Sequence, residues 1–415
     1  MLSGRRPTWA EVDLNHLAGN LTRVRNRIGP AKRILAVVKA DAYGHGAVPV
    51  SLCLEQAGAD CLAVALPEEG IELREAGVRC AILLLGPLGP DQFGAIFDYR
   101  LIPTLTEWPI LDELEKAAAR RGARLPFHLK VDTGMGRLGV LPESLPSGLE
   151  RLRELKMCRL AGVFSHLACA EETSNPHTGW QRRRFEETLQ VLKTGGVRVP
   201  MAHLANSAAI LDHPDCLLQA VRPGIPLYGC HPSETSSRME IEPVLQFRTR
   251  VLGIKEVPPN TPIGYGSAYR TRRPSRIAIL PAGYHDGVPR TMPPRGSVLL
   301  HGKRAPLAGL VSMDLAAADV TEIPEVQRGD VATLVGRDGP EEIRIEEVAA
   351  VARSIPYEIL CRIGNRVPRI YHRTGIPVSI QGRLQMPAPG RPAAGLEREQ
   401  IITQDQGGIG SWAPS

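Results

Sequence analysis

The amino-acid sequence predicts an α/β fold, a (β/α)8 barrel followed by a mainly β C-terminal domain. Between residues 34 and 221, short apolar runs alternate with longer amphipathic stretches. After about residue 235, strand-like segments are separated by turns rich in proline and glycine. The first pattern is typical of parallel strands joined by helices, and the second of antiparallel strands joined by turns. The chain has 415 residues, which is enough for both domains.

Eight apolar runs are candidate barrel strands. They are residues 34–38, 62–65, 81–85, 101–105, 125–131, 160–164, 200–204 and 217–221. Each parallel pair needs a crossover, and the stretches 107–121 and 181–192 have helical periodicity. Eight such units favour a closed barrel, with a doubly wound open sheet as the alternative. We place the barrel at residues 15–235.

The second domain is expected at residues 236–373. Its strand-like segments are residues 244–254, 276–280, 297–300, 305–311 and 330–335, with one helical stretch at 345–353. Residues 1–14 include a strand-like segment that we expect to pack with this domain. Residues 374–415 are rich in glycine, proline and glutamine, which predicts a disordered tail.

Composition excludes several classes of function. The net charge is only +6 and aromatic residues make up 4%, which argues against nucleic-acid binding. No apolar run approaches the roughly 18 residues needed to span a membrane, and the N-terminus lacks a secretory signal, so we expect a cytoplasmic protein. The eight cysteines occur singly and never as Cys-x-x-Cys, so we expect no metal site.

Lys39 is the first candidate for chemistry. It directly follows the first apolar run, and barrel enzymes carry their active sites at the carboxyl ends of the strands. A partly dehydrated lysine has a lowered pKa and becomes a nucleophile for carbonyl groups. A lysine that merely reaches solvent is the more common case when this residue is taken alone.

The loops after the seventh and eighth runs predict a phosphate site. Such barrels often bind phosphate there, and here the loops contain Asn206-Ser207 and Arg222-Pro-Gly224-Ile225. Asn206 and Ser207 also suit a helix N-terminus, whose free N–H groups bind anions. A lysine combined with a phosphate site indicates a phosphorylated aldehyde cofactor, and pyridoxal 5'-phosphate fits this description.

Residues 134–139 match Gly-x-Gly-x-x-Gly, which can bind dinucleotides. The match lies in the fifth βα unit, whereas the dinucleotide fingerprint normally opens its domain. It also places the bulky Arg137 within the turn. The dinucleotide interpretation is therefore disfavoured.

The sequence closely resembles the alanine racemase family, fold-type III pyridoxal-phosphate enzymes, over roughly residues 5–372. Six motifs carry the resemblance: Val38-Lys39-Ala-Asp-Ala-Tyr43-Gly-His-Gly46, Lys130-Val-Asp132-Thr-Gly134-Met-Gly-Arg137-Leu-Gly139, Arg222-Pro-Gly224-Ile-Pro-Leu-Tyr228-Gly229, Gly264-Tyr265-Gly266, Gly283-Tyr284-His-Asp286-Gly287 and Ser312-Met313-Asp314.

The resemblance implies interconversion of L- and D-alanine, which supplies D-alanine for peptidoglycan. It implies a two-base mechanism, in which Lys39 binds pyridoxal phosphate and serves one face of the substrate. Tyr265 serves the other face and comes from the second subunit of a homodimer. Taken alone, Tyr265 would be read as a half-buried strand residue.

The resemblance also assigns the residues that bind cofactor and substrate. Arg222 faces the pyridine nitrogen, His166 faces the ring, and Arg137 binds the phenolic oxygen and the substrate carboxylate. The N–H of Met313 is the second carboxylate anchor, and Lys130 is expected to be carbamylated. The phosphate ligands implied are Tyr43, Asn206, Ser207, Gly224, Ile225 and Tyr357.

Three alternative functions remain open at this point. Leu310 stands where the family often has arginine in the substrate channel, so a racemase for serine or a broader range is an alternative. A barrel-type decarboxylase is a second, although such enzymes place an acidic residue at the pyridine nitrogen. A non-catalytic cofactor carrier is a third, but such proteins resemble the barrel alone.

Overall fold

The barrel occupies one half of the molecule. The computed structural model describes residues 6–233, 239–373 and 376–381. Eight parallel strands pair in the order β4-β3-β2-β9-β8-β7-β6-β5. They are β2 (Arg33–Val37), β3 (Cys61–Val64), β4 (Ala81–Leu84), β5 (Thr104–Leu105), β6 (Leu125–Lys130), β7 (Cys158–Phe164), β8 (Ala202–His203) and β9 (Ala220–Val221).

Backbone hydrogen bonds at Ile102 join the two ends of this sheet. Its N–H donates to Ile82 O at 2.8 Å, and its carbonyl accepts from Leu84 N at 2.9 Å. These bonds link β4 to the residues just before β5 and nearly close the barrel. The predicted barrel is therefore confirmed, and the open sheet is excluded.

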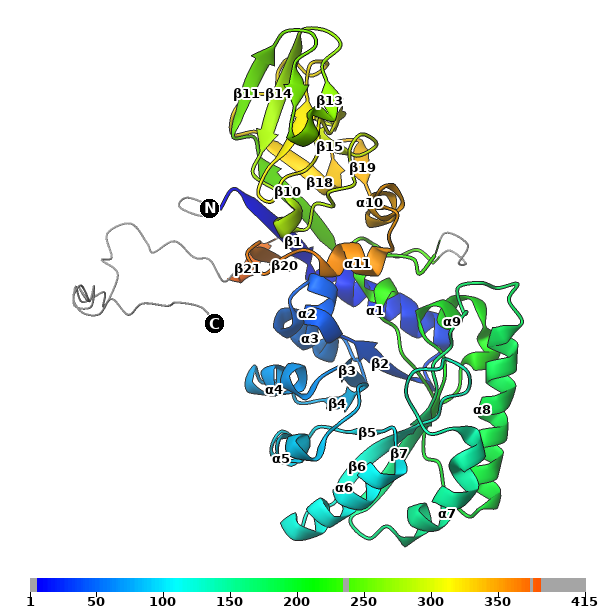
Figure 1. Cartoon of the computed structure of the whole chain (residues 1–415). Coiled ribbons are helices and arrows are strands. Elements are labelled where there is room, and N and C mark those ends of the chain that lie inside the picture. Colours follow the sequence, from blue (N-terminus) through cyan, green and yellow to red (C-terminus); the bar gives the residue numbers. More distant parts are fainter. Residues whose placement is uncertain (1–5, 234–238, 374–375, 382–415) are drawn as a thin grey trace, which may run out of the picture.

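Helices surround the barrel and cover its outer face (Figure 1). α1 shows why: its amphipathic sequence buries Leu17, Leu21 and Val24, and Asp13 caps its first turn. The α-helices are α1 (Leu14–Ile28), α3 (Ala47–Gln56), α4 (Pro67–Glu75), α5 (Phe93–Asp98), α6 (Trp108–Arg121), α7 (Leu145–Glu154), α8 (His177–Thr194) and α9 (Ser207–Asp212). Short 3-10 turns are η1 (Pro90–Gln92), η2 (Pro142–Ser144), η3 (Pro214–Cys216) and η4 (Ile225–Tyr228). Within the described part of the chain, no helix combines the length and the apolar character needed to cross a bilayer.

The second domain is mainly β and lies above the barrel in Figure 1. Its large sheet has the order β16-β15-β18-β10-β1-β20-β21, with β19 paired to β18. A three-stranded sheet, β11-β14-β17, and the hairpin β12-β13 complete it. The strands are β10 (Leu245–Arg250), β11 (Gly253–Val257), β12 (Pro262–Ile263), β13 (Tyr269–Arg270), β14 (Ser275–Leu280), β15 (Ser297–Leu300), β16 (Lys303–Pro306), β17 (Ala316–Asp319), β18 (Val331–Asp338), β19 (Glu341–Ile343) and β20 (Arg369–Arg373). The helical elements are η5 (Tyr265–Ser267), η6 (Tyr284–Asp286), α10 (Ile345–Ala352) and α11 (Pro356–Cys361).

The first and the last strands of the described residues both belong to the large sheet. β1 (Thr8–Asp13) pairs antiparallel with β10 and parallel with β20. β21 (Ile376–Gln381) pairs antiparallel with β20. This strand lies within the 374–415 segment that we expected to have no regular structure, so that expectation needs correction for residues 376–381. Apolar residues alternate there, and β20 offers a free edge; residues 374–375 and 382–415 lie outside the described residues.

Candidate active site

Lys39 lies at the mouth of the barrel, two residues beyond the end of β2. It opens α2 (Lys39–Gly44), in which four residues in succession, Ala40 to Tyr43, adopt the left-handed conformation with φ of 52–54°. Non-glycine residues in this region cost roughly 1–2 kcal/mol each. Such strain is typical of functional sites, where surrounding contacts hold the backbone in place.

The β domain supplies several of those contacts. Arg369 of β20 donates to Gly44 O from Nε at 3.1 Å and from Nη2 at 2.9 Å. Tyr371 donates its hydroxyl to His45 O at 3.0 Å. On the barrel side, Glu69 accepts from Ala40 N at 2.6 Å. The position of Lys39 therefore depends on both domains, and α2 and α11 lie side by side in Figure 1.

Asp132 organises the glycine-rich loop after β6. Its carboxylate accepts four backbone N–H groups, from Gly134, Met135, Gly136 and Arg137, at 2.8–3.1 Å. Burial alone would raise the pKa of Asp132, but these hydrogen bonds outweigh it and hold the pKa below its ordinary value. The Gly-x-Gly-x-x-Gly pattern is thus a loop folded around a carboxylate, which fixes the backbone of Arg137.

Arg222 is buried at the end of β9. Nη1 donates to His203 Nδ1 at 2.7 Å and to His203 O at 2.9 Å, and Nη2 donates to Ser165 O and Leu204 O at 2.7 and 2.9 Å. Because His203 Nδ1 accepts, its proton lies on Nε2, which donates to His128 Nδ1 at 2.8 Å. Burial lowers the pKa of Arg222 to about 9, so the guanidinium stays protonated at neutral pH.

Four cations converge on this region: Lys39, Lys130, Arg137 and Arg222. Burial, together with Arg137 and Arg222, lowers the pKa of Lys130 to about 8, although Asp132 acts in the opposite direction. Lys130 Nζ lies 5.5 Å, and the Arg222 guanidinium carbon 5.2 Å, from the centre of the Phe164 ring. The site is therefore strongly electropositive, as a binding site for an anion requires.

His166 faces the same group of cations. Burial and then Arg222 lower its pKa well below the ordinary range, so the ring is neutral. Its Nδ1 lies 3.5 Å from Arg222 Nη2. Gln181 fixes the loop by donating to His166 O at 2.9 Å.

The predicted phosphate ligands form a cradle around Gly224. The Gly224 N–H donates to Ser207 Oγ at 3.0 Å, and Asn206 caps α9 through Ala209 N. A side chain at Gly224 would place its Cβ 2.6 Å from the Tyr43 hydroxyl and 3.6 Å from Ser207 Oγ. The rings of Tyr43 and Tyr357 lie 5.9 Å apart, and Ile225 is buried directly after Gly224. The hydroxyl groups of Tyr43 and Ser207 therefore lie so close to the Gly224 backbone that a side chain at this position would clash with Tyr43.

Tyr265 and Met313 lie elsewhere in the same chain. Tyr265 opens η5, which lies between β12 and β13 in the chain. Figure 1 shows β13 at the end of the β domain far from α2. The exposed fractions of Tyr265 and Met313 are 67% and 53%. Within one chain, the barrel residues and Tyr357 of α11 lie together, whereas Tyr265 and Met313 are exposed.

Large apolar side chains are exposed on both surfaces concerned. On the β domain they include Leu315, two residues after Met313, and Tyr284, whose N–H donates to Ser312 O. On the barrel they include Leu66 and Leu141, which follow the carboxyl ends of β3 and β6. Exposed apolar surface of this kind is typical of interaction sites.

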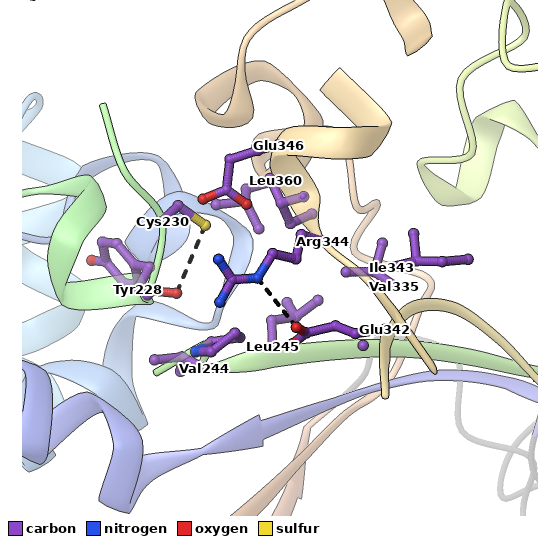
Figure 2. Close-up of a pocket in the computed structure, with 14 residues that line it drawn as sticks. Tyr228, Cys230, Val244, Leu245, Val335, Glu342, Ile343, Arg344, Glu346 and Leu360 are labelled. Carbon is purple, nitrogen blue, oxygen red and sulfur yellow. Dashed lines mark hydrogen bonds and ion pairs between the residues drawn. The ribbon is translucent and has the colours of Figure 1, made fainter. Parts of the chain in front are cut away.

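A separate small cavity lies where the barrel meets the β domain. Figure 2 shows Tyr228 and Cys230 on one side, with Arg344 between them and Glu342. Arg344 pairs with Glu342 at 3.2 Å. The Tyr228 hydroxyl points instead to Val37 O at 2.9 Å, and the Tyr228 ring lies 4.9 Å from Tyr43. Tyr228 therefore connects this cavity to the cradle through its contact with Tyr43.

The residues present fit a phosphorylated aldehyde cofactor, since a lysine, three further cations and the Gly224 cradle meet at one barrel mouth. Fold and site together define a lysine-dependent barrel enzyme with an added β domain. The family model for the N-terminal domain of alanine racemase matches residues 12–232, and that for the C-terminal domain matches residues 244–371. The chain belongs to the alanine racemase family.

Individual relatives agree over nearly their whole length. The chain is 44% identical to an alanine racemase of Halothermothrix orenii, covering 88% of this chain and 97% of the relative. It is 42% identical to one of Methanococcus maripaludis, covering 88% and 98%. The solved alanine racemase of Bacillus anthracis with bound L-Ala-P has a TM-score of 0.85 at 37% identity, covering 91% and 98%.

Several supporting residues were missed by sequence reasoning. Asp132 and Asp286 stand inside the quoted motifs, but no role was assigned to either. His128, Phe164 and Arg369 carried no signal at all, because each acts through partners distant in sequence. An aspartate two positions before a Gly-x-Gly turn is the one cue that could have indicated Asp132.

Proposed function

We propose that the protein interconverts L- and D-alanine with pyridoxal 5'-phosphate as cofactor. The observation that carries the proposal is the set of Lys39, Arg222 and the Gly224 cradle at one barrel mouth. The family membership and the matching relatives support it. When bound, the cofactor withdraws electrons from the substrate and so makes its α-proton acidic.

The protein would hold the cofactor from three sides. Lys39 would hold its aldehyde carbon, and the residues that would hold its phosphate are Gly224 through its N–H, Ser207, Asn206, Ile225, Tyr43 and Tyr357. Four N–H groups of Arg222 already have protein partners. Its Nε–H has none among the described residues and is the donor available to the pyridine nitrogen. Because arginine keeps its proton, that nitrogen would stay unprotonated.

Racemisation needs a base on each face of the α-carbon. Lys39 serves one face, and Tyr265 of the partner subunit serves the other. The exposure of Tyr265 supports a homodimer with shared sites, as does the position of the neighbouring strand β13, far from α2 of the same chain (Figure 1). Arg137 and the partner's Met313 N–H would bind the substrate carboxylate, and His166 would pack against the ring.

Lys130 is proposed to be carbamylated. With a pKa of about 8, roughly one tenth of this lysine is neutral at pH 7 and about half at pH 8, and the neutral amine is the form that reacts with carbon dioxide. The carbamate would turn one cation into an anion between Arg137 and Arg222. Intact mass measured in bicarbonate should show one added carbon dioxide, and its absence would count against the modification. We further propose a cytoplasmic role in supplying D-alanine for peptidoglycan.

Incubation of the holoenzyme with L-alanine in deuterated buffer tests the function. We expect D-alanine that carries deuterium at the α-carbon. Release of carbon dioxide would indicate a decarboxylase instead, and no exchange would refute racemisation. L-Serine run in parallel tests the broader range suggested by Leu310, which lines an apolar groove beside Tyr265.

A further inference from the structure

Asp286 lies at the centre of a polar cluster in the β domain, and its side chain is fully buried. Arg366 donates to it from Nε at 2.7 Å and from Nη2 at 3.1 Å. Arg6, 280 positions away in sequence, donates to both carboxylate oxygens. Burial alone would raise the pKa of Asp286, but the hydrogen bonds from Arg6 and Arg366 outweigh it and keep the group ionised.

This cluster reaches the loop that carries Met313. Arg366 Nη2 lies 2.7 Å from Asp314 Oδ1 and donates to Met313 O at 3.4 Å. Asp286 closes η6 by accepting from Gly283 N at 2.9 Å. The Asp286 carboxylate therefore links η6, the Met313 loop and the N-terminal segment.

The backbone of η6 fixes the peptide group of Met313. Tyr284 N donates to Ser312 O at 3.0 Å, and His285 N donates to Met313 O at 3.1 Å. In a trans peptide, C=O and N–H point in opposite directions. Holding Ser312 O toward η6 therefore turns the Met313 N–H away from η6.

The two loops touch along their backbones. A Cβ at Gly283 would lie 2.2 Å from Met313 O, so the contact leaves no room for a side chain. A displacement of η6 would consequently move the Met313 peptide as well.

We propose that Asp286, together with Arg366 and Arg6, is a positioning group that sets the direction of the Met313 N–H and so the affinity for the substrate carboxylate. The inference rests on the proposed function, in which this N–H serves the site of the partner subunit. The cluster touches neither substrate nor cofactor and acts through the loop.

The test compares Arg366→Met with Arg366→Lys and with a control, Arg304→Met. Arg304 pairs with Glu341 and Glu347 on the exposed side of the same domain. We expect Arg366→Met to raise KM for L-alanine about tenfold, the size expected for a lost charged hydrogen bond, with a much smaller change in kcat. The absorbance of the Lys39-bound cofactor should remain, because Lys39 lies on the barrel. Arg366→Lys should recover part of the affinity, and the control should match the wild type.

An unchanged KM in Arg366→Met, or an equal rise in Arg304→Met, would overturn the inference. A lowered melting temperature with unchanged KM would show a structural role alone and would also overturn it. If Arg366→Met fails to fold, Arg366→Lys carries the same test, since it loses the two-point contact. Failure of the wild type to racemise alanine would refute the proposed function, and the inference with it.

Discussion

Arg222 is held by groups that carry no negative charge. Its partners are three backbone carbonyls, His203 and, at 3.5 Å, His166, and burial and Arg222 lower the pKa of both histidines well below the ordinary range. The charge is therefore fixed in place but not neutralised within the protein. Burying such a charge is costly, and an anionic cofactor would offset the cost. Cofactor binding is thus expected to stabilise the folded state as well as to enable catalysis.

The titration of Lys130 tests how much the buried positive charge destabilises the folded protein. The pKa of Lys130 is about 8 in the folded protein, against an ordinary 10.5. Between these values the unfolded chain binds more protons, so this group should make stability rise with pH from 8 to 10.5. Below pH 8 the full cost of the buried charge applies. Lys130→Met should therefore stabilise the cofactor-free protein at pH 7 by about 1–3 kcal/mol.

Urea unfolding in bicarbonate-free buffer measures this effect. The advantage of Lys130→Met should shrink as the pH rises above 8. Lys303→Met, which removes an exposed lysine paired with Glu325, should change little. A variant less stable than the wild type throughout this range would contradict the assignment.

Gly224 allows a second residue-scale prediction. Gly224→Ala places a Cβ against the Tyr43 hydroxyl, so we expect at least about tenfold weaker binding of pyridoxal phosphate, the scale of one strained contact. In a Tyr43→Phe background the same change should cost less, because the clashing oxygen is gone. Gly253→Ala is the matched control, since a Cβ there meets nothing within 4 Å. Equal losses in both backgrounds would show that the clash is not the cause.

Among the secondary-structure elements, α2 is unusual because four of its residues form a left-handed turn. It turns the chain directly after a barrel strand and is held in part by Arg369 and Tyr371 of the β domain. The strained geometry is therefore a product of domain packing. A barrel without its β domain would lose contacts that hold Lys39 in place.

Substitutions at Ala40, which is exposed, test this strain. Ala40→Val adds a β-branched side chain at positive φ, and we expect a loss of about 1–2 kcal/mol of stability with less Lys39-bound cofactor. Ala40→Gly should be neutral or slightly stabilising, because glycine adopts this conformation freely. Urea unfolding and cofactor absorbance measure both variants. Equal effects of valine and glycine would argue against a left-handed turn.

Helices and strands could be predicted where their residues follow a local periodic pattern. Features that depend on contacts between residues far apart in sequence could not. All eight barrel strands were predicted, although β5, β8 and β9 are shorter than the apolar runs suggested. No local signal indicated the left-handed turn at residues 40–43, because the contacts that hold its end at Gly44 and His45 come from residues more than 300 positions away. The partnership of Arg6 with Asp286 is hidden for the same reason.

At the scale of the whole molecule, the halves of the proposed site lie in different parts of one chain. Mixing two inactive variants tests this arrangement. Lys39→Ala and Tyr265→Phe should each be nearly inactive, whereas a hybrid dimer contains one intact site of two. An equal mixture that exchanges subunits should recover about one quarter of wild-type activity.

Racemase assays after mild dissociation and reassociation measure this recovery. Native mass spectrometry of differently tagged chains would confirm that hybrids form. Hybrids without activity would mean that Tyr265 does not serve the site of the other subunit.

Arg369 connects the two parts of a chain that would serve different active sites of the proposed dimer. It binds Gly44 O beside Lys39, and also Ile363 O, Gly364 O and Val367 O, next to the Arg366 that holds the Met313 loop. Each chain would lend its Lys39 to one reaction centre and its Met313 to the other. In a cell with one normal and one altered gene copy, a Lys39 change spares one centre in every hybrid. An Arg369 change enters both centres of every hybrid, so only the roughly one quarter of dimers that pair two normal chains would be spared.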